Sequence, residues 1–188
     1  VVEVGEGVTR IQPGDRVTVL PTAMGRCGVC RSCRSGNYFF CPNRTSLGSR
    51  RDGGFADYCV VPQELAYPLP KRVDYSTAAL VEPLACCVKA VWSLTRISPG
   101  DLVLISGPGP IGLICGLLAR LSGGRTVVCG TAGDKERLQI AELLGMDNTV
   151  DVSTEDVAET VRDLSEGAGA DVVFECGGAA TSVNQCLD

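Results

Sequence analysis

Four cysteines lie close together in the first quarter of the chain. Cys27, Cys30, Cys33 and Cys41 have the spacing C-x2-C-x2-C-x7-C. Four thiolates at such short spacing are typical of a tetrahedral zinc site with Zn–S bonds of about 2.3 Å. Metal binding would also order the loop, because a turn-rich segment has few apolar side chains to bury. We predict a structural zinc lobe at residues 26–45.

The charge around these cysteines fits a thiolate centre. No Asp or Glu occurs between Arg16 and Arg51. Four thiolates around a divalent ion carry a net charge of about −2. Arginines nearby can offset that charge and donate hydrogen bonds to sulfur. Those in or beside the cluster are Arg26, Arg31, Arg34, Arg44, Arg50 and Arg51.

Two other interpretations of the cysteines stay open. A disulfide with two free thiols is one, although the odd total of 11 cysteines does not favour it. An iron–sulfur cluster is the other, because C-x2-C-x2-C also opens the bacterial ferredoxin motif. Cys41 precedes Pro42 as in that motif, but it comes after a gap of seven residues rather than about three. A cluster would absorb visible light, whereas zinc would not.

A glycine-rich loop gives a second candidate site. Residues 107–112 read G-x-G-x-x-G, directly after the apolar run 102–105 and at the start of a predicted helix. Gly107 permits the tight turn, Gly109 lets a pyrophosphate approach the backbone, and Gly112 lets the helix pack closely on the strand. The alternative is a glycine-rich turn without a ligand.

The helix after this loop should present free N–H groups to the phosphates. Pro110 suits the first helical position, where its missing N–H is not needed. Ile111 belongs to the same cofactor-binding stretch. Its side chain is expected in the core with others at helical spacing, namely Ile114, Leu117, Leu118 and Leu121.

The choice of dinucleotide depends on the residues just after the second strand, where an acidic side chain would bind the ribose hydroxyls. The candidates there are Thr131, Asp134 and Arg137. Asp134 comes late and also suits a helix N-cap, whereas Arg137 could meet a 2′-phosphate. The sequence therefore leaves both NAD and NADP open.

The elements around these sites fall into two groups. Up to about residue 80 the chain is rich in turns and short strands, predicted at 1–4, 16–20 and 55–61. Beyond that, strands and helices alternate, which predicts a parallel sheet with crossover helices. The predicted strands are 102–105, 126–129, 148–152 and 171–176, and the predicted helices are 76–94 with Ser76 as N-cap, 110–121, 134–144 and 154–165. Because the chain starts in a predicted strand and stops in a predicted helix at 182–188, we expect an interior fragment of a longer protein.

The composition excludes several classes of function. There is no histidine, so Ser-His-Asp and Cys-His catalysis cannot occur within this chain. The net charge of −5 argues against a nucleic-acid partner. No apolar run reaches the length of a membrane span. Thiolate ligands without disulfides suggest the reducing cytoplasm.

Taken together, these motifs resemble the zinc-containing medium-chain dehydrogenase/reductase family, near its sorbitol, threonine and polyol dehydrogenases. The resemblance covers essentially the whole chain. It is carried by Pro13–Val17, the four-cysteine lobe, Gly53–Ala56, Glu82–Ala85 and the loop at 107–112. It implies an α/β protein with a partial GroES-like catalytic domain at 1–82 and a partial Rossmann doubly wound parallel sheet at 83–188. A homodimer or homotetramer is implied for the full-length protein.

The resemblance also implies a catalytic role for Glu82. In the polyol-type members a glutamate at this position binds or approaches the catalytic zinc, directly or through water. The other ligands would come before Val1, so the fragment itself is expected to be inactive. An ordinary capping or surface carboxylate is the alternative, and Cys86 and Cys87 are expected to be buried as small hydrophobic residues.

The implied reaction is zinc-assisted hydride transfer between an alcohol or polyol substrate and NAD or NADP. Two other classes remain. One is a zinc- or iron–sulfur-containing nucleotide-binding module without dehydrogenase activity. The other is a zinc-free reductase relative, against which the cysteine lobe argues.

Overall fold

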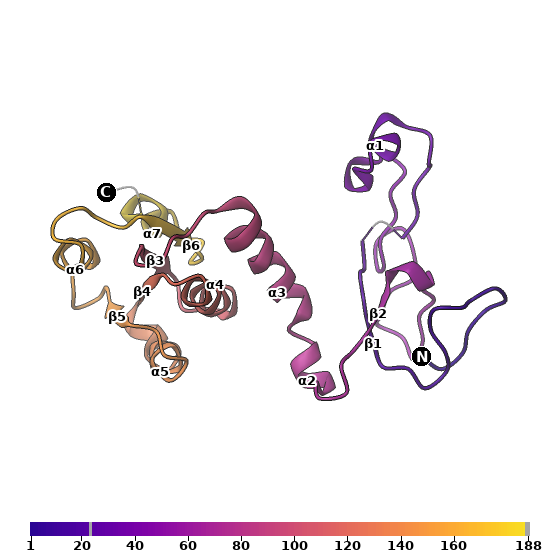
Figure 1. Ribbon diagram of the computed structural model, residues 1–188, viewed down its shortest axis with the longest axis horizontal. Coiled ribbons are helices and arrows are strands. Elements are labelled where there is room, and N and C mark those ends of the chain that lie inside the picture. The colour runs from indigo at the N-terminus through magenta and orange to yellow at the C-terminus, as the bar shows by residue number, and fades with distance from the viewer. Residues whose placement is uncertain (23, 187–188) are drawn as a thin grey trace. The chain divides into compact units, whose positions relative to one another are not determined.

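The computed structural model describes residues 1–22 and 24–186 and divides the chain into two compact units (Figure 1). These are Val1–Ala79 and Leu80–Asp188. The first consists of turns and short strands, and the second alternates strands and helices. Part of the helix predicted at 182–188 lies outside the described residues; up to that point the structure has α7, Ala180–Gln185.

The first unit contains one antiparallel pair of strands. Strand β1 (Val17–Val19) pairs with β2 (Ala66–Pro68). The predicted turn before β1 forms, since the Asp15 N–H donates to the Gln12 carbonyl at 3.1 Å and Gly14 has φ 93°. Strand β2 contains Pro68, and a strand tolerates proline at the edge of a sheet, as both strands of this pair are. The unit's helical elements are α1 (Arg31–Arg34), η1 (Tyr38–Phe40), η2 (Gln63–Leu65) and α2 (Tyr75–Ala78).

Two strands predicted in this unit do not form. Residues 1–4 and 55–61 have no strand structure, and Phe55 is fully exposed. Val1 instead accepts a hydrogen bond from the Gly14 N–H at 2.9 Å. A strand persists only when a neighbour satisfies its backbone groups, and among the described residues neither segment pairs with β1 or β2.

The long helix predicted from Ser76 is broken into pieces. Asp74, not Ser76, caps α2, because its carboxylate accepts the Thr77 N–H at 2.6 Å. Helix α3 (Val81–Val88) then begins anew and continues as the π-helical turn η3 (Lys89–Leu94). Pro83 explains the break, since it has no N–H to donate and its ring crowds the carbonyl four residues before it.

The second unit is built on a four-stranded parallel sheet in the order β5-β4-β3-β6. All five residues of the central strand β3 are buried. The bounds are β3 Leu102–Ser106, β4 Arg125–Gly130, β5 Asn148–Asp151 and β6 Val172–Glu175. All four predicted strands, and the parallel arrangement, are therefore confirmed.

Helices cover both faces of this sheet (Figure 1). On one face α4 (Pro110–Leu121) and α5 (Lys135–Leu143) share a core with β3 and β4, and α3 packs on α4. On the other face α6 (Val157–Leu164) packs against the same strands. A short turn, η4 (Ala132–Asp134), joins β4 to α5. No helix among the described residues is long and apolar enough to cross a membrane.

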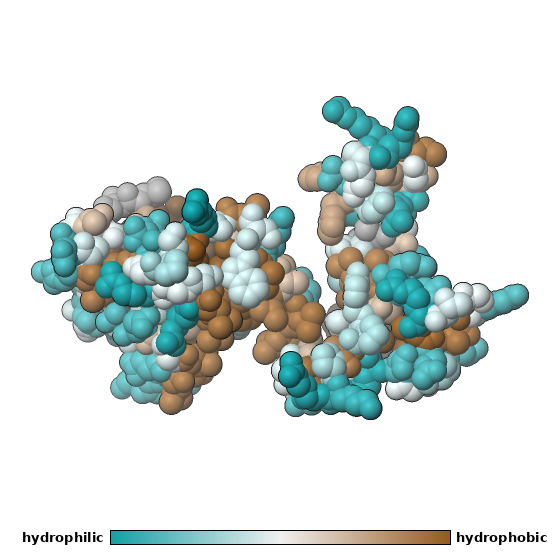
Figure 2. Space-filling view, in the orientation of Figure 1, coloured by the Kyte–Doolittle hydropathy of each residue, from teal (hydrophilic) through white to brown (hydrophobic). Residues whose placement is uncertain are grey.

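The buried face of α4 differs from the prediction. Ile111 is 41% exposed and Leu121 75% exposed, whereas Leu118 is buried. Because this helix is apolar on all sides, residue spacing alone does not identify the face that packs. Small residues decide it: a Cβ on Gly116 would lie 2.8 Å from the Met146 sulfur. Figure 2 shows hydrophobic residues gathered over α3 and α4 of this unit.

The strand order reverses direction at β3. The chain runs outward through β3, β4 and β5 and then returns to place β6 on the other side of β3. Ligands of doubly wound sheets bind at such a reversal, beyond the carboxyl ends of the two strands. The loops there are 107–109 and 176–179.

Candidate metal centre and dinucleotide site

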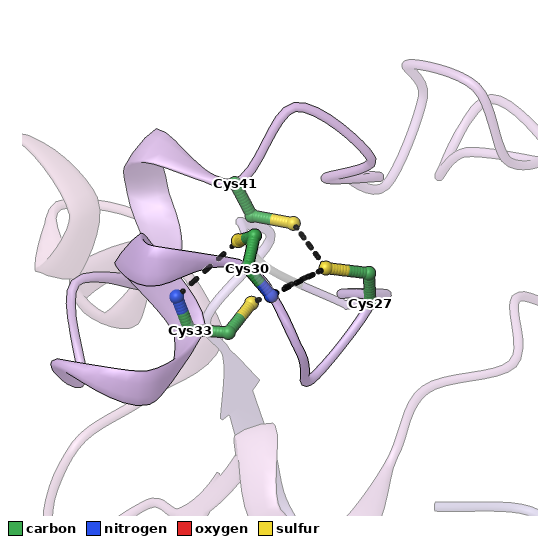
Figure 3. A group of neighbouring side chains, drawn as sticks. All are labelled: Cys27, Cys30, Cys33 and Cys41. Carbon is green, nitrogen blue, oxygen red and sulfur yellow. Dashed lines mark hydrogen bonds between the residues drawn. The ribbon is translucent and has the colours of Figure 1, made fainter.

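The four lobe cysteines point their sulfur atoms at one another (Figure 3). The Cys27 sulfur lies 3.9 Å from that of Cys33 and 3.7 Å from that of Cys41. All four sulfur atoms are within 4.8 Å of one another. Zinc with bonds of about 2.3 Å in a tetrahedron needs sulfur atoms about 3.8 Å apart. The donor set therefore fits a single zinc ion.

The local backbone explains how so short a segment gathers these side chains. The Cys30 N–H donates to the Cys27 sulfur, and the Cys33 N–H donates to the Cys30 sulfur, each at 3.4 Å. Cys30 thereby caps α1, which carries Cys33. Gly25 and Thr45 exchange backbone hydrogen bonds at 3.4 and 3.0 Å, which closes the base of the lobe.

The thiols differ in how easily they ionise. Hydrogen bonds from the Cys30 and Val29 N–H groups lower the pKa of Cys27 to about 6. Burial raises the pKa of Cys33 to about 12. Cys27 therefore ionises more readily than Cys33, whose buried thiol would lose its proton more easily beside a bound cation.

The arginines around the lobe do not bind sulfur as predicted. Arg44 donates to the Phe39 carbonyl at 3.0 Å, and Arg50 donates to the Pro42 carbonyl at 3.3 Å. The guanidinium of Arg26 lies 4.0 Å from the centre of the Tyr38 ring. Backbone amides donate to the Cys27 and Cys30 sulfur atoms, whereas these arginines bind carbonyls and a ring of the loop and supply positive charge only at longer range.

The cysteines of the described residues form no disulfide. All 11 are free, and the sulfur–sulfur distances of 3.7 and 3.9 Å in the lobe are far above the bonded length of about 2.05 Å. The disulfide interpretation is therefore wrong for this structure.

The glycine loop lies where β3 passes into α4, and its three glycines have different surroundings. Gly107 has φ 104°, and a Cβ there would lie 2.7 Å from the Gly177 nitrogen. A Cβ on Gly112 would clash with the Gly107 carbonyl oxygen. A Cβ on Gly109 would meet no atom within 4 Å. Packing thus explains the first two glycines, while Gly109 borders open space.

The start of α4 is free to bind an anion. Gly109 is its N-cap and makes no side-chain capping bond, and Pro110 comes next, at the first turn. An uncapped helix start offers N–H groups and a partial positive charge. The open space at Gly109 and these N–H groups together fit the pyrophosphate of a dinucleotide.

The residues after β4 form a closed network. The Asp134 carboxylate accepts the Thr131 N–H at 3.1 Å and the Thr131 hydroxyl at 2.9 Å. Its other oxygen pairs with Arg137 at 2.9 Å. The hydrogen bonds from Thr131, aided by Arg137, lower the pKa of Asp134. Asp134 is the N-cap residue of α5, as predicted, but its side chain makes no capping bond to that helix and instead closes the turn back onto Thr131.

Glu82 lies exposed in the first turn of α3. It does not cap this helix, because Leu80 is the N-cap and makes no side-chain capping bond. The Cys86 thiol donates to it over a long 3.8 Å. Cys87 is buried as predicted, whereas Cys86 is exposed, because the two point to different sides of the helix. Within the described residues Glu82 joins no group of three metal-ligating side chains.

Sequence reasoning missed the loop after β6. Glu175 accepts the N–H groups of Gly177 and Gly178 at 2.9 and 2.8 Å and the Ser182 hydroxyl at 2.7 Å. This network fixes the backbone of Gly177, which lies against Gly107 where the strand order reverses. The paired glycines directly after a strand were the signal that could have indicated it.

Comparison with known proteins identifies the class. Residues 1–71 match the family model of the alcohol dehydrogenase GroES-like domain, and residues 110–188 match that of the zinc-binding dehydrogenases. With the sheet order and the two sites above, this defines a two-domain dehydrogenase fold. The chain belongs to the zinc-containing medium-chain dehydrogenase/reductase family.

Curated relatives match along the entire chain. It is 44% identical over 188 residues to a sorbitol dehydrogenase of Halalkalibacterium halodurans, covering 100% of this chain and 54% of that protein. It is 38% identical over 187 residues to D-arabitol-phosphate dehydrogenase of Enterococcus avium, covering 100% of this chain and 53% of that protein. The chain thus spans about half the length of the curated relatives it matches.

Solved structures share the fold. A Sinorhizobium meliloti protein assigned as a zinc-binding dehydrogenase and bound to NADP has a TM-score of 0.86 at 39% identity, covering 99% of this chain and 54% of that one. The alcohol dehydrogenase of Aeropyrum pernix has a TM-score of 0.78 at 30% identity, and the match covers 97% of this chain and 54% of that one.

Proposed function

We propose that this chain is part of a zinc-dependent oxidoreductase that transfers a hydride between an alcohol or polyol and NAD or NADP. The observation that carries the proposal is the loop at 107–112, where Gly109 borders open space beside the uncapped start of α4. Relatives named as sorbitol and arabitol-phosphate dehydrogenases support a polyol as the substrate. Neighbours described as bound to NADP and as NAD-dependent support the cofactor class.

The two parts of the chain would have the roles of the family's two domains. Residues 1–82 would form the catalytic domain, with the lobe at 26–45, and residues 83–188 the dinucleotide-binding domain. Cys27, Cys30, Cys33 and Cys41 would hold a structural zinc ion that fixes the lobe. The close approach of their sulfur atoms, all within 4.8 Å, supports one ion rather than a cluster, which must fit several iron and sulfide ions between its ligands.

Glu82 is the catalytic residue that this chain would contribute. When bound, a zinc ion there would act as a Lewis acid toward the alcohol oxygen, and the nicotinamide would exchange the hydride. The backbone of the glycine loop would hold the pyrophosphate, and this would fix the dinucleotide relative to β3 and β6. An exposed Glu82, free of a capping role, is available for this task.

The setting of the whole protein is part of the proposal. Reduced thiolate ligands favour the cytoplasm, and the family favours a homodimer or homotetramer. Small alcohols, rather than nucleic acids, would be its partners.

The experiment uses the protein at its natural full length. Zinc content would be measured together with reduction of NAD and NADP, using polyols, amino alcohols and simple alcohols as substrates. We expect Glu82→Ala to lose one zinc ion and to lower turnover at least about a hundredfold, as removal of a group acting in the transition state does. Glu159→Ala, which removes a carboxylate from the first turn of α6, is the matched control and should stay active.

The alternative module makes a different prediction. It would bind the nucleotide and the lobe zinc but show no turnover with any alcohol, and Glu82→Ala would change nothing. Visible absorption of the purified protein would indicate an iron–sulfur cluster instead of zinc.

A further inference from the structure

We infer that the dinucleotide site selects NADP(H) over NAD(H), with Arg137 as the residue that meets the 2′-phosphate. The inference rests on the proposed function, because it concerns the same site. Three features at the carboxyl end of β4 carry it: a strand end without room for a side chain, a carboxylate that is already occupied, and an arginine with free donors.

The first feature is the close packing of Gly130, the last residue of β4. A Cβ on Gly130 would lie 2.8 Å from the Pro108 ring and 3.1 Å from the Asp134 Cβ. The residue that ends this strand is where a carboxylate would accept the two ribose hydroxyls of NAD. Pro108 of the phosphate loop fills that place, so the strand end itself offers the ribose no acceptor.

The second feature is the state of Asp134, the next carboxylate along the chain. One of its oxygens accepts the N–H and the hydroxyl of Thr131 at 3.1 and 2.9 Å, and the other pairs with Arg137 at 2.9 Å. A ribose diol needs a carboxylate with free acceptor positions pointing at it. To accept both hydroxyls of the diol, one on each oxygen, Asp134 would have to release Thr131 and open the turn at 131–134.

The third feature is Arg137, in the first turns of α5. Its side chain is 58% exposed, and only one of its nitrogens is paired with Asp134. A guanidinium has several further N–H groups in a planar fork that suits phosphate oxygens. Asp134 holds this fork in place without occupying it. A 2′-phosphate thus finds a positioned cation beside an Asp134 carboxylate that is already engaged with Thr131 and Arg137.

The test compares ligands that differ only at the ribose 2′-position. Dissociation constants of the full-length protein would be measured by calorimetry or fluorescence for NADPH against NADH, and for adenosine 2′,5′-bisphosphate against 5′-AMP. We expect the 2′-phosphorylated ligand to bind at least about tenfold more tightly in both pairs, as charge-assisted hydrogen bonds provide.

Two variants locate the effect. Arg137→Gln should weaken NADPH binding about tenfold and leave NADH binding within about twofold. Arg162→Gln removes an equal charge from the end of α6 and should change neither. Thermal unfolding of both variants checks that they fold alike.

The outcomes separate this inference from the proposed function. Equal or tighter binding of NADH by the unmodified protein, or an Arg137→Gln variant that keeps its NADPH affinity, would overturn the inference and leave the dehydrogenase proposal standing. If the protein binds neither dinucleotide, both fail.

Discussion

The backbone of Gly107 lies directly against that of Gly177, so that a Cβ on Gly107 would fall 2.7 Å from the Gly177 nitrogen. This contact joins the loops after β3 and β6, the two strands between which the chain reverses direction. Glu175 fixes the second loop by accepting the Gly177 and Gly178 N–H groups. The close contact between the two loops thus leaves Gly107 no room for a side chain.

Replacing Gly107 should therefore damage the fold itself. Gly107→Ala combines a φ of 104° with a backbone clash. We expect it to lower the free energy of unfolding by about 1–3 kcal/mol. Urea unfolding followed by circular dichroism measures this loss. A variant as stable as the natural protein would contradict the close contact between the two loops.

Gly109 should behave in the opposite way. Because a Cβ there meets no atom within 4 Å and φ is −72°, Gly109→Val should leave the free energy of unfolding within about 1 kcal/mol. Dinucleotide binding should be lost, since the new side chain would occupy the space of the pyrophosphate. Calorimetric titration with NADPH and NADH measures this, and unchanged affinity would refute the placement of the phosphates.

The cysteine lobe should depend on its metal for local order. We expect Cys30→Ser to lose the lobe zinc and to make residues 26–45 sensitive to protease, because thiolate ligation is what orders the segment. Cys59→Ser changes an exposed free cysteine of the same unit and serves as the control. Zinc analysis and limited proteolysis measure the two effects. A Cys30→Ser protein with full zinc and a resistant lobe would count against a structural metal centre.

Asp147 should make the second unit sensitive to acid. Burial alone would raise the pKa of its carboxyl, but hydrogen bonds from the Thr126 N–H and hydroxyl at 2.8 and 2.9 Å outweigh this and lower it. A carboxyl whose pKa is lowered by folding stabilises the fold above its unfolded pKa. That contribution disappears as the pH falls through the lowered folded pKa.

The variant Asp147→Ala tests this link. It removes the acceptor of the N–H and hydroxyl of the fully buried Thr126, so we expect a loss of about 1–3 kcal/mol at pH 7 and a flatter dependence of stability on pH below about 4, the ordinary pKa of an aspartate. Asp163→Ala, at an exposed position of α6, is the control. Equal pH profiles for Asp147→Ala and the natural protein would show that the Asp147–Thr126 pair does not stabilise the fold.

Patterns that act over a few residues could be predicted. The lobe cysteines lie close together in the sequence. Within the same turn, backbone N–H groups donate hydrogen bonds to the Cys27 and Cys30 sulfur atoms. The glycine loop is equally local, because its turn, strand and helix are consecutive. The buried strand 102–105 was predictable because a strand covered on both faces is apolar throughout.

Features that depend on residues far away in the sequence could not be predicted. Residues 55–61 have the composition of a strand but pair with no strand among the described residues, so they form irregular and largely exposed backbone. Ile111 and Leu121 lie on a helix that is apolar on most sides, where the close packing of Gly112 on Gly107 and of Gly116 on Met146 selects the buried face. The role of Asp134 depended on whether its two oxygens were free, which no spacing reveals.

The sequence by itself determined the functional groups and the fold class: four thiolates in one loop, a phosphate-binding glycine turn, and alternating strands and helices that form a parallel sheet. Each depends on neighbours within a few residues, so the local chain encodes it. Only the tertiary structure decided that Gly107 touches Gly177, that Pro108 closes the end of β4 and that Arg137 keeps free donors. Those facts arise where segments far apart in the chain compete for the same space, and packing settles that competition.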